Sequence, residues 1–198
     1  MTNKETILSF EDLEIQFTLR GQTLKAIRGV SLDVHRGESL AIVGESGSGK
    51  SVFTKSCMGL LDANGSITAG HIWYAGHDLA QYKTEKEWLT IRGREIAMVM
   101  QDHMTSLNPL KRIGDQITEA VVLHQGLKGV EAKAAAVKAL EAVGIDDPER
   151  RYRQYPHEFS GGMRQRVVIA IAVGGPPHRR ICDAPPTPQG RPHQAQRR

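Results

Sequence analysis

The stretch Gly44-Glu45-Ser46-Gly47-Ser48-Gly49-Lys50-Ser51 decides how the rest of the chain is interpreted. It has the pattern G-x-x-x-x-G-K-S, in which a glycine-rich turn points its backbone N–H groups at phosphate oxygens. Lys50 supplies an ammonium group for the outer phosphates, and the Ser51 hydroxyl is a hard oxygen ligand of the kind that Mg²⁺ prefers. The pattern predicts a loop that holds a nucleoside triphosphate.

The residues on either side of this loop fit its chemistry. Residues 39–43, Ser-Leu-Ala-Ile-Val, form a short apolar run typical of a buried parallel strand. After the loop, Val52, Phe53, Cys57 and Leu60 recur at helical spacing. We therefore expect a strand, the loop and a helix in succession, with the start of the helix adding partial positive charge beside the phosphates.

The composition favours one folded chain without a membrane span. Its 198 residues are enough for a sizeable core. The two cysteines, Cys57 and Cys182, have no metal-binding spacing and predict a reducing compartment rather than a disulfide framework. The longest apolar run, residues 167–173, is too short to cross a bilayer, and the N-terminal residues lack the apolar core of a signal peptide. These features predict a soluble cytosolic chain.

The net charge of +4 is confined to the C-terminal end of the sequence. Residues 174–198 contain five of the 26 Lys and Arg residues but one of the 22 acidic residues, so the charges of the preceding residues balance. We therefore expect no nucleic-acid partner, because such binding requires a basic patch on the folded part of a protein.

Hydrophobic periodicity predicts an antiparallel N-terminal region followed by a buried strand. Residues 13–19 and 30–34 alternate between apolar and polar, as strands with one buried face do, and residues 70–74 form a further strand pattern. Residues 96–100 form an apolar run typical of a buried parallel strand. Gln101 follows at the strand end where α/β sheets bind ligands, although a polar residue there can also simply end the strand.

Three helical segments predict a separate helical lobe. Residues 113–124 place their apolar side chains on one face, and residues 130–143 are rich in alanine and stop before Gly144, a typical helix-ending residue. A short helix is expected to begin at Pro148. Because these helices follow one another without a strand between them, they interrupt the α/β pattern.

A second glycine-containing segment, Phe-Ser-Gly-Gly-Met-Arg-Gln-Arg at residues 159–166, predicts another helix start. Ser160 is a favourable N-cap residue, and Met163, Val167 and Ile171 fall on one apolar face. Free N–H groups at a helix start bind anions. The segment is either an ordinary capped helix or a second anion site that serves a nucleotide held by another molecule.

The order and spacing of these motifs resemble an ATP-binding cassette domain over nearly all of residues 7–173. The Ser-Gly-Gly-Met-Arg-Gln run is similar to the signature motif of that family. Residues 98–110, MVMQDHMTSLNPL, and residues 155–162, YPHEFSGG, resemble the branch that powers oligopeptide and dipeptide importers (OppD/DppD-like).

The resemblance implies an α/β fold class. Its parts are the mostly parallel sheet of a P-loop NTPase, an N-terminal antiparallel β subdomain, a helical signature subdomain and an incomplete C-terminal part. The nucleotide-binding domain is expected at residues 1–173, with the helical subdomain at about 102–165. Residues 174–198, which hold six of the nine prolines, are expected to form an irregular tail.

The resemblance also implies roles for individual residues. Phe17, which periodicity alone makes a core residue, corresponds to an aromatic that stacks on adenine. ATP is expected to contact Phe17, Gly44, Glu45, Ser46, Gly47, Ser48, Gly49, Lys50, Ser51, Val52 and Gln101. The bound Mg²⁺ is expected at Ser51, Gln101 and Asp183, and Gln101 also contacts the attacking water. The signature residues, expected to close on the ATP of a partner subunit, are Ser160, Gly161, Gly162, Met163 and Gln165.

The partners implied by the resemblance are those of a transporter. They are a second ATPase subunit, identical or different, transmembrane permease subunits that dock on the helical lobe, and indirectly an extracytoplasmic solute-binding protein. ATP binding and hydrolysis are expected to drive transport of peptides or similar solutes at the cytoplasmic face of the inner membrane.

The sequence departs from the family pattern after Gly174. Ala184 stands where the family has the glutamate that polarises the attacking water, and a methyl group accepts no proton. Arg179 and Arg180 stand where a buried strand is expected. We interpret the chain as C-terminally truncated or frameshifted, binding ATP but hydrolysing it poorly.

Other interpretations remain open from the sequence. The chain could be the non-hydrolysing member of an asymmetric pair, a cassette ATPase of nucleic-acid processing, or a fragment without function of its own. The balanced charge and the MTSLNP stretch at residues 104–109 argue against nucleic-acid processing.

Overall fold

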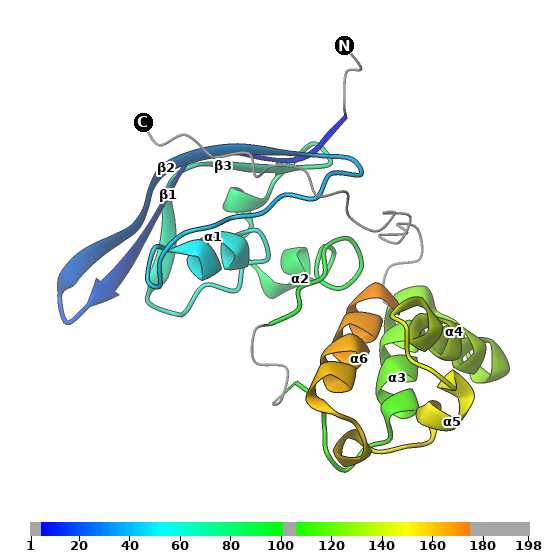
Figure 1. The fold of residues 1–198 in the computed structure, drawn as a ribbon. Coiled ribbons are helices and arrows are strands. Elements are labelled where there is room, and N and C mark those ends of the chain that lie inside the picture. Colours follow the sequence, from blue (N-terminus) through cyan, green and yellow to red (C-terminus); the bar gives the residue numbers. More distant parts are fainter. Residues whose placement is uncertain (1–4, 101–105, 175–198) are drawn as a thin grey trace. The chain divides into compact units, whose positions relative to one another are not determined.

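The computed structural model describes residues 5–100 and 106–174, which form two compact units. The first unit runs to Trp88 and the second begins at Leu89 (Figure 1). Gln101, Asp183 and Ala184 lie outside the described residues. The first unit carries the glycine-rich loop of residues 44–51, called the phosphate loop below, and the second carries the segment around Ser160.

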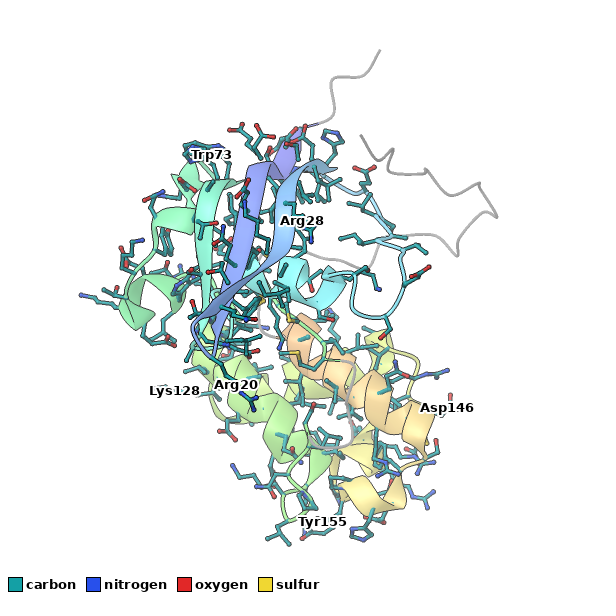
Figure 2. All side chains as sticks on the ribbon, turned by 90° about the vertical axis from the view of Figure 1, so that its left-hand side faces the viewer. Arg20, Arg28, Trp73, Lys128, Asp146 and Tyr155 are labelled. Carbon is teal, nitrogen blue, oxygen red and sulfur yellow. The ribbon has the colours of Figure 1, made fainter. Side chains whose placement is uncertain are left out.

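The first unit is built on a four-stranded antiparallel sheet. Its strands are β1 (Thr6–Leu19), β2 (Gln22–His35), β3 (Gly65–Tyr74) and β4 (His77–Asp78), in the spatial order β2-β1-β3-β4. Arg20 lies in the β1–β2 turn at one end of this sheet and Trp73 lies towards the other (Figure 2). The antiparallel N-terminal region predicted from alternation is confirmed.

Helix α1 (Lys50–Ser56) lies on one face of this sheet (Figure 1). The Phe53 ring of α1 packs against Phe10 of β1, with ring centroids 4.3 Å apart and planes inclined at 40°. Leu13 and Ile15 of β1 and Ile72 of β3 complete the buried face. Because alternate residues of a strand share one face, Leu13 and Ile15 are buried together, whereas a register shift between Phe10 and Leu13 lets Phe10 join the same core.

The first unit closes with short elements after β4. A 3₁₀ helix (Leu79–Gln81) is capped by Asp78, whose carboxylate accepts hydrogen bonds from the backbone N–H groups of Ile72 and Ala80, both at 3.1 Å. Helix α2 (Glu85–Trp88) buries the Trp88 side chain. These contacts hold the chain after β4 against the sheet.

Two strands predicted from apolar runs are not formed in the described residues. Residues 39–43 have no regular structure, and the side chains of Leu40, Ile42 and Val43 are 40%, 42% and 88% exposed. In residues 96–100, Ile96 makes an isolated bridge with Arg92 and the rest are irregular. A central parallel strand needs neighbours on both edges and cover on both faces, and the described residues supply neither.

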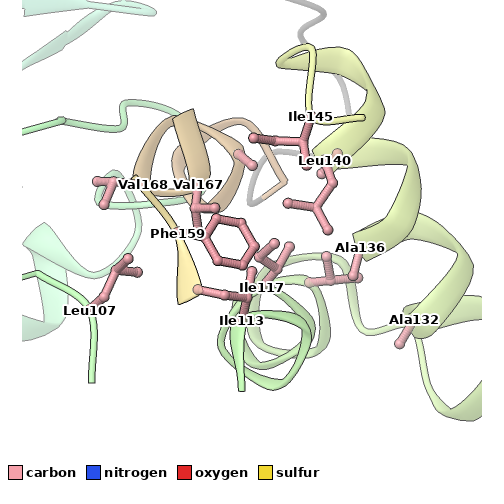
Figure 3. Close-up of a cluster of buried hydrophobic side chains, with 13 residues drawn as sticks. Leu107, Ile113, Ile117, Ala132, Ala136, Leu140, Ile145, Phe159, Val167 and Val168 are labelled. Atoms are coloured by element: carbon pink, nitrogen blue, oxygen red, sulfur yellow. The ribbon is translucent and has the colours of Figure 1, made fainter. Parts of the chain in front are cut away.

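The second unit consists of helices packed on one core. They are α3 (Ile113–Gln125), α4 (Gly129–Ala142), α5 (Pro148–Tyr152), a 3₁₀ helix (Pro156–Glu158) and α6 (Gly161–Gly174). The core joins Ile113 and Ile117 of α3, Leu140 of α4 and Val167 of α6 around the Phe159 ring (Figure 3). The predicted helices are confirmed, with boundaries within a residue or two.

No helix within residues 5–100 and 106–174 combines the length and apolarity that a bilayer span requires.

A close approach of α5 to α3 depends on Gly114. A Cβ atom at this position would lie 2.3 Å from the Tyr152 ring, so only a glycine lets the ring pack on the α3 backbone. The Tyr152 hydroxyl then reaches the Thr118 hydroxyl at 2.9 Å. The ring and its hydrogen bond therefore tie α5 to α3.

We predict that Gly114→Ala destabilises the protein by about 1–3 kcal/mol, because it overpacks the site beneath Tyr152. Helix propensity alone predicts the opposite sign, since alanine is favoured over glycine in a helix by about 1 kcal/mol. In a Tyr152→Ala background, where the ring is gone, the same Gly114→Ala change should stabilise. Urea unfolding of the four proteins tests this, and the same sign in both backgrounds would contradict it.

Candidate functional site

The phosphate loop is held at its C-terminal end by the sheet. Gly49 is the N-cap of α1 and has a φ of 88°, a conformation that disfavours residues with a Cβ atom. A Cβ atom there would also lie 2.8 Å from Ile27 Cδ1 and 3.0 Å from the Ala26 carbonyl oxygen. The loop thus enters α1 in close contact with β2, where a larger residue does not fit.

The remainder of the loop faces solvent. Residues 44–48 and Ser51 are exposed, and Val52 is half-buried next to the buried Phe53. Within the described residues, the N–H groups of Gly47 and Gly49 donate no hydrogen bond and the Ser51 hydroxyl has no partner. An exposed turn with free N–H groups is suited to receive the oxygens of an anion.

Lys50 lies across the loop and contacts it at three points. Its Nζ atom donates to the Gly44 carbonyl oxygen at 2.8 Å, to the Glu45 carbonyl oxygen at 2.5 Å and to Ser48 Oγ at 3.2 Å. The Ser48 N–H donates in turn to the Glu45 carbonyl oxygen at 3.3 Å. The Lys50 ammonium is therefore held against the loop, which is where a bound phosphate would need a positive charge.

Phe17 lies near the end of β1 and is half-buried. Its ring covers Gly65 of β3, where a Cβ atom would lie 2.6 Å from Phe17 Cε1. A half-buried ring is compatible with packing in the sheet and with stacking on a base, so the adenine contact stays a prediction.

The second predicted anion site lies at the start of α6. Ser160 Oγ accepts a hydrogen bond from the Met163 N–H at 3.3 Å, which is the N-cap predicted from the sequence. Phe159, directly before it, is buried in the helical core. Gly161 and Gly162 are exposed, and a Cβ atom on either would meet nothing within 4 Å.

The side chains around this helix start are half-buried or exposed. Met163 is half-buried against the helical core, whereas Gln165 is exposed. Before the core residue Phe159, the Tyr155 N–H donates to Glu158 Oε2 at 2.7 Å, which closes the short 3₁₀ helix. Residues 160–165 thus present the exposed backbone of two glycines and the exposed Gln165 side-chain amide, next to the buried Phe159.

Of the three predicted magnesium ligands, Ser51 lies within the described residues. Ser51 is exposed at the start of α1, whereas Gln101 and Asp183 lie outside the described residues. In residues 5–100 and 106–174, no cluster of three or more His, Cys, Asp or Glu side chains could hold a metal ion. The Ser51 hydroxyl is thus the predicted ligand whose surroundings can be described.

Comparison with known sequences identifies the family. The sequence model of the family described as ABC transporter matches residues 27–187. The chain belongs to the ABC transporter family. The matched range includes the whole phosphate loop and the segment around Ser160.

Individual members of the ABC transporter family resemble the chain along most of its length. It is 52% identical to the oligopeptide transport ATP-binding protein AmiE of Streptococcus pneumoniae, over 93% of this chain and 52% of that protein. It is 47% identical to the dipeptide transport ATP-binding protein DppD of Bacillus subtilis, over 92% of this chain and 55% of that protein. The chain therefore spans about half the length of the curated relatives it matches.

Solved structures of ABC cassettes share the fold. A dimeric ATP-binding cassette in a post-hydrolysis state, bound to ADP and Pi, matches with a TM-score of 0.72 at 24% identity. The match covers 85% of this chain and 70% of that one. The predicted fold class is confirmed, with its antiparallel N-terminal sheet and its helices.

Sequence reasoning missed the residues that support the two segments. Helical spacing marks Phe53 as apolar but not its partner Phe10. The sequence pattern indicates neither the packing of Phe159 nor the contact between Ser48 and Lys50. These roles depend on contacts with Phe10, the helical core and a folded-back side chain. The local sequence does not show which partners these side chains meet.

Cys57, the C-cap residue of α1, is a buried thiol at the end of the helix that lies away from the loop. Its Sγ atom donates to the Thr54 carbonyl oxygen at 3.0 Å. Burial raises the pKa of the Cys57 thiol from its ordinary 9.0 to about 11, because the thiolate is poorly solvated there.

We predict that Cys57 contributes a pH-dependent part of stability on the alkaline side. A pKa raised in the folded state favours folding below the unfolded pKa, so this contribution is complete below pH 9.0 and is lost as the pH rises towards 11. In a Cys182→Ser background, Cys57 should react slowly with iodoacetamide at pH 8 and fast in urea. Rapid alkylation of the folded protein would contradict the prediction, and a Cys57→Ser variant controls for lysine modification.

Proposed function

We propose that the chain is the nucleotide-binding subunit of an ABC importer that moves peptides or similar solutes, and that it binds ATP with Mg²⁺. The observation that carries the proposal is the loop from Gly44 to Ser51, exposed and anchored to the sheet, with the Lys50 ammonium held against it. Similarity to oligopeptide and dipeptide transport ATP-binding proteins supports the transported class.

The loop supplies the chemistry of phosphate binding. The free N–H groups of Gly47 and Gly49 and the Lys50 ammonium are donors for phosphate oxygens. Glu45, Ser46, Ser48 and Val52 complete the proposed ATP-contacting stretch, and Phe17 offers an aromatic face for the base. Hydrogen bonds between cations and phosphate are strong because both groups are charged.

Magnesium fits the donor atoms available at the loop. The exposed Ser51 hydroxyl is a hard oxygen donor without a protein partner in the described part of the chain. Gln101 and Asp183 are the further ligands proposed from the family pattern. A bound Mg²⁺ neutralises charge that develops on the phosphates.

The assembly proposed for the chain follows from its two anion-binding segments. The exposed residues Ser160, Gly161, Gly162 and Gln165, with Met163, would close on the ATP of a second subunit, identical or different. Permease subunits would bind the helical lobe at the cytoplasmic face of the inner membrane, and the solute-binding protein would act through them. The nucleotide-binding domain is proposed to cover residues 1–173, with its helical part at about 102–165.

A second candidate function is nucleotide binding without hydrolysis. It is favoured by Ala184, which stands at the position expected for the catalytic glutamate. Loss of a general base lowers a rate by about 10²–10⁴-fold, whereas binding through the loop does not need that residue. The chain would then contribute a regulatory ATP site to an asymmetric pair.

Replacement of the loop lysine tests nucleotide binding. We expect saturating ATP with Mg²⁺ to stabilise the chain by about 2.7 kcal/mol at a hundredfold excess over Kd, because the ligand binds only the folded state. Lys50→Met should abolish most of this shift in thermal melting. Lys55→Met, the same change five residues further along α1, should retain it. Equal behaviour of the two variants would refute the role of Lys50.

Restoration of the missing carboxylate tests hydrolysis. We expect the unchanged chain to bind ATP with little release of phosphate, and Ala184→Glu to raise the turnover rate by about 10²-fold or more. Ala184→Gln provides the matched control, since its amide cannot act as a base. Magnesium-dependent turnover by the unchanged chain at the rate of the Ala184→Glu variant would exclude the non-hydrolysing function.

A further inference from the structure

The Lys50 ammonium is saturated by the loop itself. A lysine side chain carries three N–H donors, and here they meet the Gly44 carbonyl oxygen, the Glu45 carbonyl oxygen and Ser48 Oγ. A phosphate group would need the same donors. Binding of phosphate therefore has to displace acceptors that Lys50 already has.

Of these three acceptors, the Ser48 hydroxyl alone depends on a side chain. The carbonyl oxygens of Gly44 and Glu45 belong to the backbone and are present whatever residues stand there. Replacing Ser48 by alanine removes one acceptor and leaves the other two. The contribution of Ser48 to the position of Lys50 can thus be isolated by one substitution.

The position of the Ser48 hydroxyl is set by more than Lys50. The Ser48 N–H donates to the Glu45 carbonyl oxygen at 3.3 Å, which closes a turn. A Cβ atom on Gly44 would lie 2.9 Å from Ser48 Oγ and 4.0 Å from Lys50 Cδ. The hydroxyl therefore fills the space beside Gly44 and points to the ammonium from a constrained place.

We propose that Ser48 is a positioning residue that holds Lys50 on the loop in the nucleotide-free protein, so that phosphate competes with the loop for the ammonium. The inference rests on the proposed function in one respect, which is that the competing ligand is a nucleoside triphosphate. The Ser48 hydroxyl stabilises the free state more than the bound state, because Lys50 leaves it when phosphate binds. Ser48 thereby weakens the affinity for phosphate and keeps the Lys50 ammonium in a fixed position before phosphate binds.

The first measurement needs no nucleotide. The rate of Lys50 acetylation by acetic anhydride is read by mass spectrometry, with Lys55 of the same helix as internal reference. The three acceptors hold the N–H donors of Nζ, and the nitrogen has to leave at least one of them before it can attack the reagent. We expect Ser48→Ala to accelerate Lys50 labelling severalfold relative to Lys55, and Ser48→Thr, which keeps a hydroxyl, to restore the original ratio.

The second measurement compares ligands with and without phosphates. Calorimetric titration with ATP, inorganic tripolyphosphate and adenosine is performed on the unchanged chain, Ser48→Ala and Ser48→Thr. We expect Ser48→Ala to bind ATP and tripolyphosphate about threefold to tenfold more tightly, the equivalent of one net hydrogen bond removed from the free state. Adenosine affinity should not change, and Ser48→Thr should restore the original values.

Each outcome is decisive for the inference. Weaker phosphate binding by Ser48→Ala would mean that the hydroxyl stabilises the bound state more than the free state, and would overturn the proposal. An unchanged labelling ratio would overturn it as well. If Lys50 is protected as expected but ATP does not bind the unchanged chain, the proposed function fails while the role of Ser48 stands. Thermal melts of the nucleotide-free variants confirm that each one folds.

Discussion

The contact between Phe10 of β1 and Phe53 of α1 is the constraint on which the unit that carries the glycine-rich loop depends. Helix α1 has seven residues, and a helix this short is not stable in water without packing. The aromatic pair holds it on the sheet, and the close fit of Gly49 against β2 holds the turn before it. Lys50 and Ser51 are presented at the surface because Phe53 is buried.

The second unit also supports an exposed segment with a buried aromatic ring, but in a different order along the chain. There the buried ring is Phe159, which precedes the exposed segment at Ser160 instead of following it. In both units a buried aromatic lies close in sequence to exposed small residues, which are Gly47 and Ser51 in the first unit and Gly161 and Gly162 in the second. Phosphate binding needs both the buried anchor and the exposed residues. A loop without an anchor loses more conformational entropy when it binds, and a buried loop cannot reach its ligand.

The sequence predicted the elements whose side-chain pattern is satisfied inside the described residues. Strand β1, which buries Leu13 and Ile15, and the helices around Ile117 and Val167 belong to this group, because each buries apolar side chains against a neighbour that is present. Residues 39–43 do not, and their apolar run was wrongly predicted to be a strand. An apolar run records a requirement for burial, and it cannot tell which other segments meet that requirement.

The sequence by itself determined the loop from Gly44 to Ser51 and the Ser160 cap, since both depend on a few consecutive residues whose backbone freedom and side-chain oxygens act locally. Only the tertiary structure decided that Phe53 meets Phe10, that Tyr152 lies on Gly114 and that Lys50 folds back onto Ser48. The first two join residues far apart in the chain, and the third is one of several rotamers open to a long side chain. Such choices depend on packing in three dimensions, for which a linear pattern carries no signal.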